Sequence, residues 1–247
     1  EEVSFCKKVF TKIYPQLQEL HPDIFPKDLQ LIKLKGNHYG PGAFYTREEA
    51  ILIPQGVLKE KQSASFYETM LHEIFHIYSR NYPEKRRALY RLIGFRPLAN
   101  VAYPSSLEQR RLTNPDGVNA HYGITLRRGD SLFTALPLII SNEKNYQPDK
   151  QRYFDYLYFD IFPVQLQSND SWLVQTRDDY RSPIHYADFP DFYQQIRTNT
   201  DYIIHPDEIL ADNFVLLVNR LNGITGKMEL TKNGKELLRL IQNILEQ

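Results

Sequence analysis

Cysteine is almost absent from this chain: Cys6 is the single one in 247 residues, so no disulfide bond can form within it. Long apolar runs are missing as well. The longest, residues 135–140, is far shorter than the roughly 18 residues that a membrane-spanning helix needs, so we expect no membrane span. The chain opens on Glu1 rather than Met, which favours a removed segment and leaves a secreted or periplasmic location open.

An excess of charge of either sign is also absent. The 30 basic and 30 acidic residues cancel, and the pairs of arginines at 86–87, 110–111 and 127–128 are scattered along the chain. This balance predicts neither a nucleic acid nor an acidic membrane surface as partner. Aromatic residues are plentiful, with 17 tyrosines. The length of the chain suits one large domain or two lobes that share a cleft.

The most informative stretch is residues 72–76, which read His-Glu-Ile-Phe-His. On an α-helix, positions four apart lie on one face, so His72 and His76 can both reach one ion. Neutral imidazole is a good zinc ligand, and zinc with three protein ligands keeps a fourth position for water. Glu73, beside the first histidine, is placed to act on that water as a general base.

The setting of this motif favours a site over a coincidental pair of core histidines. Apolar residues recur every three or four positions over 63–82, with no Gly or Pro before Pro83, which predicts one helix. Apolar neighbours on all sides of the motif predict that this helix is buried. Ionisable groups inside it must be paired or bind a metal, because leaving them unsatisfied costs several kcal/mol.

The remaining pattern predicts further helices and strands around the motif. We expect a helix over 2–20 that is bent or interrupted at Pro15, and an irregular stretch over 168–200 made of loop with short elements. The other expected elements are a strand over 29–35, two strands over 43–46 and 50–54 joined by a turn at 47–49, a helix over 84–92, strands over 124–126, 132–140 and 153–165, and helices over 207–221 and 235–247.

The order of these expected elements along the chain resembles that of the upper lobe of zincin metallopeptidases: a helix, strands, a hairpin and then a His-Glu-x-x-His helix. The resemblance implies that the hairpin over 43–54 supplies the strand that holds an extended peptide substrate. The metzincin branch continues the motif with Gly and His, where this chain has Ser79 and Tyr82, so that branch is excluded. The gluzincin branch takes its third ligand from a glutamate on a later helix, followed four residues on by an aspartate.

Glu208 and Asp212 match that gluzincin pattern. In the family the glutamate binds zinc and the aspartate accepts a hydrogen bond from a ligand histidine, which implies the same roles here. Glu84, Glu108 and His205 remain alternatives for the third ligand. The donor that could face an oxyanion is left open, and His205 is favoured because it lies one turn before Glu208. The other candidates are Tyr122, Tyr180, His121, His185 and Tyr202. His205 is also the candidate for substrate binding.

We therefore expect an α+β, zincin-like protein that binds Zn²⁺. Residues 1–95 would form an upper lobe with a small sheet and the motif helix, and residues 96–247 a lower lobe with a β-rich insertion and C-terminal helices. The expected activity is hydrolysis of peptide bonds in a peptide or protein substrate by zinc-bound water, with Glu73 as general base. The alternatives are a non-catalytic binding protein of this fold and a zinc hydrolase of a non-peptide bond.

Overall fold

The computed structural model describes residues 1–36, 39–58, 63–117, 121–150, 152–168, 170–177, 179–224 and 229–247. Helices and strands both contribute, so the expected α+β class is confirmed. The chain divides into two compact units. Unit 1 comprises residues 1–89 and 210–247, and unit 2 comprises residues 90–209. Unit 1 thus includes C-terminal helices that the sequence analysis assigned to the lower lobe.

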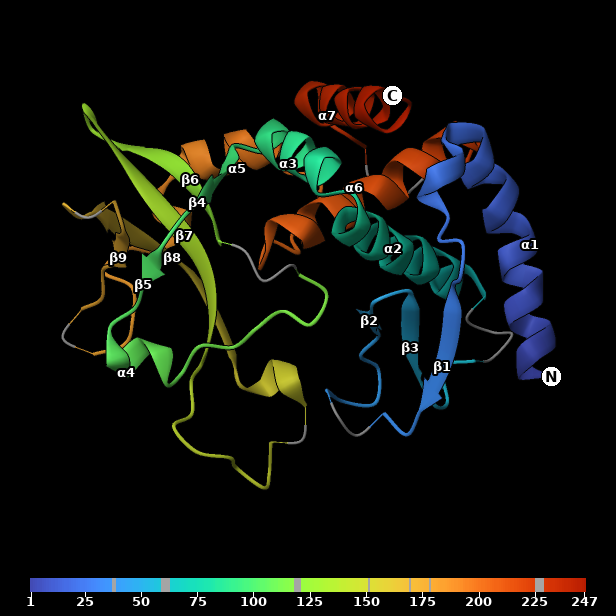
Figure 1. The fold of residues 1–247 in the computed structure, drawn as a ribbon, viewed down its shortest axis with the longest axis horizontal. Coiled ribbons are helices and arrows are strands. Elements are labelled where there is room, and N and C mark those ends of the chain that lie inside the picture. Colours follow the sequence, from blue (N-terminus) through green and yellow to red (C-terminus); the bar gives the residue numbers. More distant parts are fainter. Residues whose placement is uncertain are drawn as a thin grey trace. The chain divides into compact units, whose positions relative to one another are not determined.

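Unit 1 contains a three-stranded sheet in the order β1-β3-β2 (Figure 1). Strand β1 (Gln30–Leu34) pairs in parallel with β3 (Ala50–Pro54), and β2 (Tyr45–Arg47) pairs antiparallel with β3. The turn between β2 and β3 falls where expected, with Glu48 in the left-handed region at a φ of 50°. Because β2 ends the sheet, it is an edge strand.

Helix α2 (Ser63–Asn81) carries the His-Glu-x-x-His motif and packs against β2 and β3. Eleven of its residues are buried, as expected for a helix that is apolar on most sides. Helix α1 (Glu2–Leu20) packs against it, with the rings of Phe5 and Phe66 5.1 Å apart. The other helices of the C-terminal part are α6 (Pro206–Leu221) and α7 (Lys232–Leu245).

We expected a bend or an interruption of the first helix at Pro15, and the interruption is wrong, because α1 runs through this residue. Pro15 costs the helix one backbone hydrogen bond, or about 3 kcal/mol. The buried side chains keep helical spacing on both sides of it; they are Phe5, Val9, Ile13, Leu17 and Leu20. Burying each is worth about 1.5–3 kcal/mol, so together they outweigh the proline.

Unit 2 is built on a six-stranded sheet in the order β4-β6-β7-β8-β9-β5. Its long strands match the expected β-rich stretch, and β8 is internal, as its apolar sequence predicts. The strands are β4 (Phe95–Leu98), β5 (Val101–Ala102), β6 (His121–Arg128), β7 (Ser131–Ser141), β8 (Leu157–Leu166) and β9 (Trp172–Val174). Its core includes Leu107, Leu136, Ile140, Phe162 and Val174.

Short elements complete the two units. The stretch expected to be irregular contains β9 and α5 (Pro190–Ile196), and α4 (Ser105–Glu108) was not expected at all. Helix α3 (Pro83–Leu92) follows α2 almost directly. Among the described residues, 3₁₀ turns lie at Pro22–Ile24, Tyr153–Asp155 and Tyr186–Asp188.

Strands β6 and β7 separate at one end, and this opening positions a pocket. Their pairing ends at Ile124 and Ala135, whereas β7 continues to pair with β8 as far as Ser141. Pro137 lies in the part of β7 that has lost β6 as neighbour. A proline has no N–H to donate, so a strand edge without a partner on that side tolerates it.

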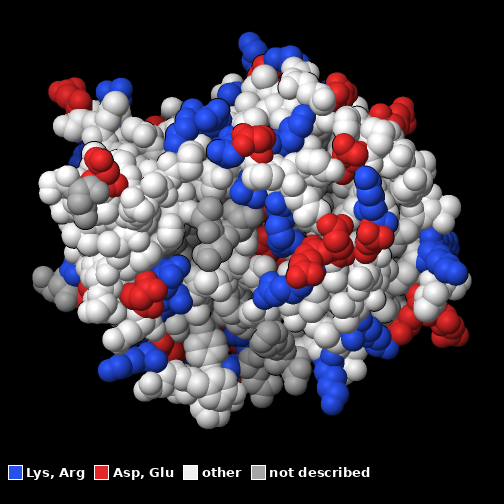
Figure 2. Space-filling model, viewed as in Figure 1, with Lys and Arg blue, Asp and Glu red and all other residues white. Residues whose placement is uncertain are grey.

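Within the described residues, no helix is long and apolar enough to cross a membrane. Acidic and basic side chains are intermingled on the face shown in Figure 2, in keeping with a net charge of zero.

Candidate metal centre

The side chains of His72, His76 and Glu208 come together and form a group that could hold a metal ion. One ligand atom from each, an imidazole nitrogen or a carboxylate oxygen, lies within 4.8 Å of the other two. It is the one group of this kind that the described part of the chain contains. His76 is 1% exposed and Glu208 2%, so these ionisable groups are almost completely shielded from water.

Contacts between α2 and α6 explain how Glu208 comes close to the two histidines, although it lies far from them in the sequence. The Asn219 amide donates to Glu68 (3.0 Å), and His72 bonds Asp212 (3.0 Å), so later residues of α2 face earlier residues of α6. The helices therefore run in opposite directions. Moving one turn along α2, to His76, corresponds to moving one turn back along α6, to Glu208. Helix α6 is continuous across residue 210, where the two units meet in sequence.

Asp212 holds one of the two histidines in a fixed orientation. Its Oδ1 atom lies 3.0 Å from Nδ1 of His72, whose side chain is 15% exposed. A carboxylate accepts, so Nδ1 carries the proton and Nε2 is left with its lone pair. This is the arrangement found behind metal-bound histidines, where an outer carboxylate fixes the tautomer of the ring.

Glu73 lies between the two histidines in sequence and is 4% exposed. Successive helix residues are 100° apart around the axis, so Glu73 points away from His72 but lies about 60° from His76. Its carboxylate is therefore next to the face that carries the histidines without sharing their direction. Glu73 is not a member of the group that could hold a metal ion.

The start of α6 holds Glu208 in place. Pro206 occupies the first turn, and Nδ1 of His205 accepts the backbone N–H of Asp207 (3.1 Å), which caps the helix. Acidic side chains are favoured at this positive end of the helix dipole. The Asn114 side-chain amide donates to Oε1 of Glu208.

The other candidate third ligands lie elsewhere. Glu84 is 81% exposed and pairs with Arg87, and Glu108 binds Arg111 through both carboxylate oxygens. Neither belongs to the group of His72, His76 and Glu208. His205 has a structural role as the cap of α6.

The candidate oxyanion donors lie in different surroundings. His121 and Tyr122 line a pocket in unit 2, together with His205. The Tyr180 ring is covered by the guanidinium group of Arg110 at 3.8 Å. The ring of His185 is held by the buried carboxylate of Asp160 (2.9 Å). The backbone N–H of Tyr202 donates to the Thr200 hydroxyl (3.0 Å).

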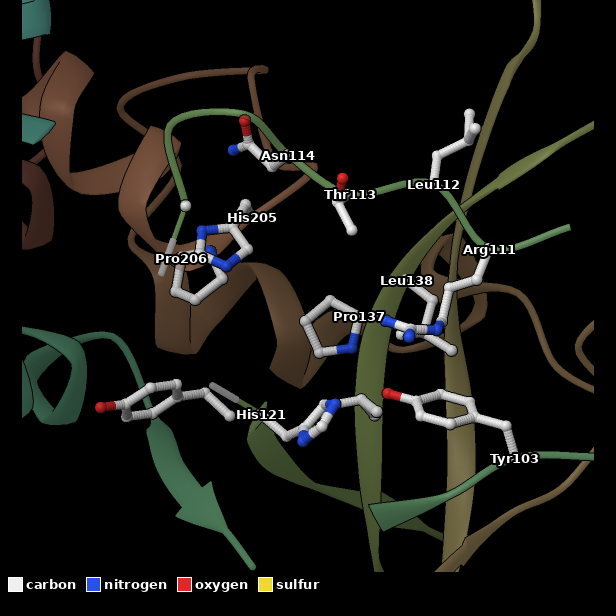
Figure 3. A pocket seen from close by; sticks show the side chains of 13 residues that line it. Tyr103, Arg111, Leu112, Thr113, Asn114, His121, Pro137, Leu138, His205 and Pro206 are labelled. Carbon is white, nitrogen blue, oxygen red and sulfur yellow. The ribbon is translucent and has the colours of Figure 1, made fainter. Parts of the chain in front are cut away.

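The pocket has a volume of about 310 Å³ and lies where β6 and β7 separate. Figure 3 shows side chains from β6, β7, the start of α6 and the segment 111–114 around it. Sequence reasoning did not find three of its polar residues: Tyr103, Arg111 and Asn114. No motif in the sequence marks any of the three. They are brought together by sheet pairing, which local sequence patterns do not reveal.

Comparison of the chain with protein-family models, with curated proteins and with solved structures gave no match. The chemistry of the chain must therefore be inferred from its own side chains.

Proposed function

We propose that this chain is a zinc-dependent hydrolase that cleaves peptide bonds. The observation that carries the proposal is the meeting of His72, His76 and Glu208 from two antiparallel helices, with Glu73 buried beside them. The spacing in each helix matches the gluzincin resemblance: His-Glu-x-x-His in α2 and Glu-x-x-x-Asp in α6.

The donor set suits zinc. Two imidazoles and one carboxylate are common ligands of catalytic zinc sites, which keep one further position open. Ligand atoms around a tetrahedral zinc ion are about 3.3 Å apart, given bonds of about 2.0–2.2 Å, so atoms grouped within 4.8 Å are compatible with one ion. Asp212 supports this assignment, because it leaves Nε2 of His72 as the atom that can donate to a metal.

A zinc ion bound there would supply a Lewis acid that polarises a carbonyl group and acidifies water. The proton transfers belong to Glu73. Its carboxylate accepts a proton from the attacking water and returns it to the nitrogen of the leaving amine, so the residue ends each cycle as it began. Its low exposure favours this task, because bulk water competes weakly for a buried carboxylate.

Substrate binding would use an edge of the sheet in unit 1. Strand β2 is an edge strand, and an extended peptide can add to such an edge through backbone hydrogen bonds. We assign this role to the hairpin of β2 and β3, as the family resemblance implies.

Glu73→Gln tests the catalytic part of the proposal. The amide has nearly the same shape but cannot accept the proton, so hydrolysis of a peptide that the wild type cuts should fall by at least about 10²–10⁴-fold. Zinc content should stay at the wild-type level, because Glu73 is not a ligand. Rates would be measured with a quenched fluorescent peptide library, and zinc by elemental analysis.

Near-normal turnover by Glu73→Gln would remove Glu73 from the mechanism. A wild type that binds zinc but cuts no peptide in the library would contradict peptide hydrolysis.

A further inference from the structure

The pocket in unit 2 has the volume and the lining of a binding site for a small polar group. Its volume of about 310 Å³ falls at the lower end of the range usual for ligand pockets. Leu136, Pro137 and Leu138 of β7 form one wall, where β6 no longer covers the strand. No aspartate or glutamate is among the described residues that line it.

Arg111 presents a fixed guanidinium group to this pocket. Its backbone bridges to Ile140 at the end of β7, and its Nε and Nη2 atoms donate to the two oxygens of Glu108, each at 3.0 Å. The ring of Tyr103 lies 4.5 Å from the guanidinium carbon. These contacts occupy one edge of the planar group, so Nη1 is turned away from Glu108. In Figure 3 the guanidinium group points toward Pro137.

Tyr103 adds a second donor. Its hydroxyl oxygen is fully buried and has no hydrogen-bond partner among the described residues. Burial raises the pKa of this phenol to about 12, so the group is neutral and carries a proton to donate. A buried hydroxyl without a partner is unfavourable, and a ligand that accepts a hydrogen bond from it would remove that cost.

The imidazoles in the pocket are also suited to an acceptor. Burial, and then the charge of Arg111, lower the pKa of His121, which favours its neutral form. His205 accepts a backbone N–H at Nδ1, so its neutral ring carries the proton on Nε2. A guanidinium group, a phenol and imidazole N–H groups therefore line a pocket in which the described residues include no acidic side chain.

We propose that this pocket binds a carboxylate group of the substrate, with Arg111 and Tyr103 as its donors. The carboxylate comes either from the C-terminus of a peptide or from an Asp or Glu side chain. The inference rests on the proposed function and adds a substrate class to it. Asn114 lines the pocket and donates to Glu208, so a group bound there is held beside the proposed zinc ligand.

The test compares peptides that differ in one carboxylate. One pair has the same acetylated sequence with either a free C-terminal carboxylate or a carboxamide. In a second pair, acetylated and amidated, Asp is replaced by Asn. Binding would be measured by calorimetry on the zinc-loaded Glu73→Gln protein, and cleavage on the wild type. A charge-assisted hydrogen bond is worth about 1.5–3 kcal/mol, so the carboxylate of one pair should bind about 10- to 100-fold tighter.

Variants of the pocket residues test whether the preference for the carboxylate arises in this pocket. Arg111→Gln should abolish it, whereas Arg127→Gln, which removes the same charge from an exposed position on β6, should keep it. Tyr103→Phe keeps the ring beneath the guanidinium group and should reduce the preference several-fold. It serves as the decisive variant if circular dichroism shows that Arg111→Gln does not fold.

Equal binding within both pairs would overturn the proposal, as would a preference that survives loss of Arg111 or, where that variant does not fold, of the Tyr103 hydroxyl. The proposed function fails separately. If neither peptide is cut but the Arg111-dependent preference persists, the pocket is a carboxylate site without peptide hydrolysis. If both are cut equally well, the hydrolase stands and the pocket assignment falls.

Discussion

Replacing Asp212 by alanine should weaken zinc binding without unfolding the chain. The Asp212 carboxylate accepts from Nδ1 of His72 at 3.0 Å and does not itself belong to the group that could hold a metal ion. Without it, the ring can rotate and can place its proton on either nitrogen. Some of the time Nε2 would then carry the proton and could not bind a metal.

The size of the effect follows from this indirect role. Loss of such an outer partner typically weakens metal affinity about 10- to 100-fold, equivalent to about 1.4–2.7 kcal/mol. The metal-free fold should lose less, because the hydrogen bond is worth about 0.5–1.5 kcal/mol and both side chains are partly exposed. Asp212→Asn keeps an acceptor oxygen but loses the charge, so its zinc affinity should lie between those of wild type and Asp212→Ala.

Zinc dissociation constants would be measured by competition with a chromophoric chelator, and stability of the metal-free proteins by urea unfolding. Glu84→Ala is the matched control, because it removes a carboxylate that is 81% exposed. Wild-type zinc affinity in Asp212→Ala would refute the reasoning. So would equal losses in Asp212→Ala and Glu84→Ala.

Two further predictions concern stability. Burial raises the pKa values of Tyr78 and Tyr103 to about 12, so between pH 10 and 12 the unfolded chain loses protons that the folded chain keeps, and stability should fall as pH rises. Tyr103→Phe should reduce that fall between pH 10 and 12 in urea unfolding, whereas Tyr146→Phe, at an exposed position, should not. Phe214→Ala should cost about 3–5 kcal/mol, because this buried ring packs 5.5 Å from that of Phe75. Urea unfolding would show no such loss for the exposed Leu221→Ala if the reasoning holds, and equal losses would contradict it.

Local sequence patterns were sufficient to predict the long helices and strands. The apolar spacing over 63–82 predicted α2 to within one residue, because its buried positions repeat at helical spacing. The turn at 47–49 was also predicted correctly. The interruption expected at Pro15 was wrong because the side chains buried on both sides of it outweigh the cost of a proline inside a helix.

The candidate site shows where sequence reasoning succeeds and where it stops. His72, His76, Glu208 and Asp212 were all nominated, because each pair repeats every four residues on a helix and matches a family pattern. The pocket in unit 2 was not predicted from the sequence. Arg111 reaches it through a bridge to the end of β7, and the pocket exists because β6 and β7 separate, which depends on pairing between segments distant in sequence.

Elemental analysis of the purified protein tests the central claim most directly. The wild type, exposed to zinc and then dialysed, should retain one zinc ion per chain. His76→Ala and Glu208→Ala should lose most of it, and Glu84→Ala should retain it. A wild type without zinc, or equal zinc in all four proteins, would contradict the proposed metal centre.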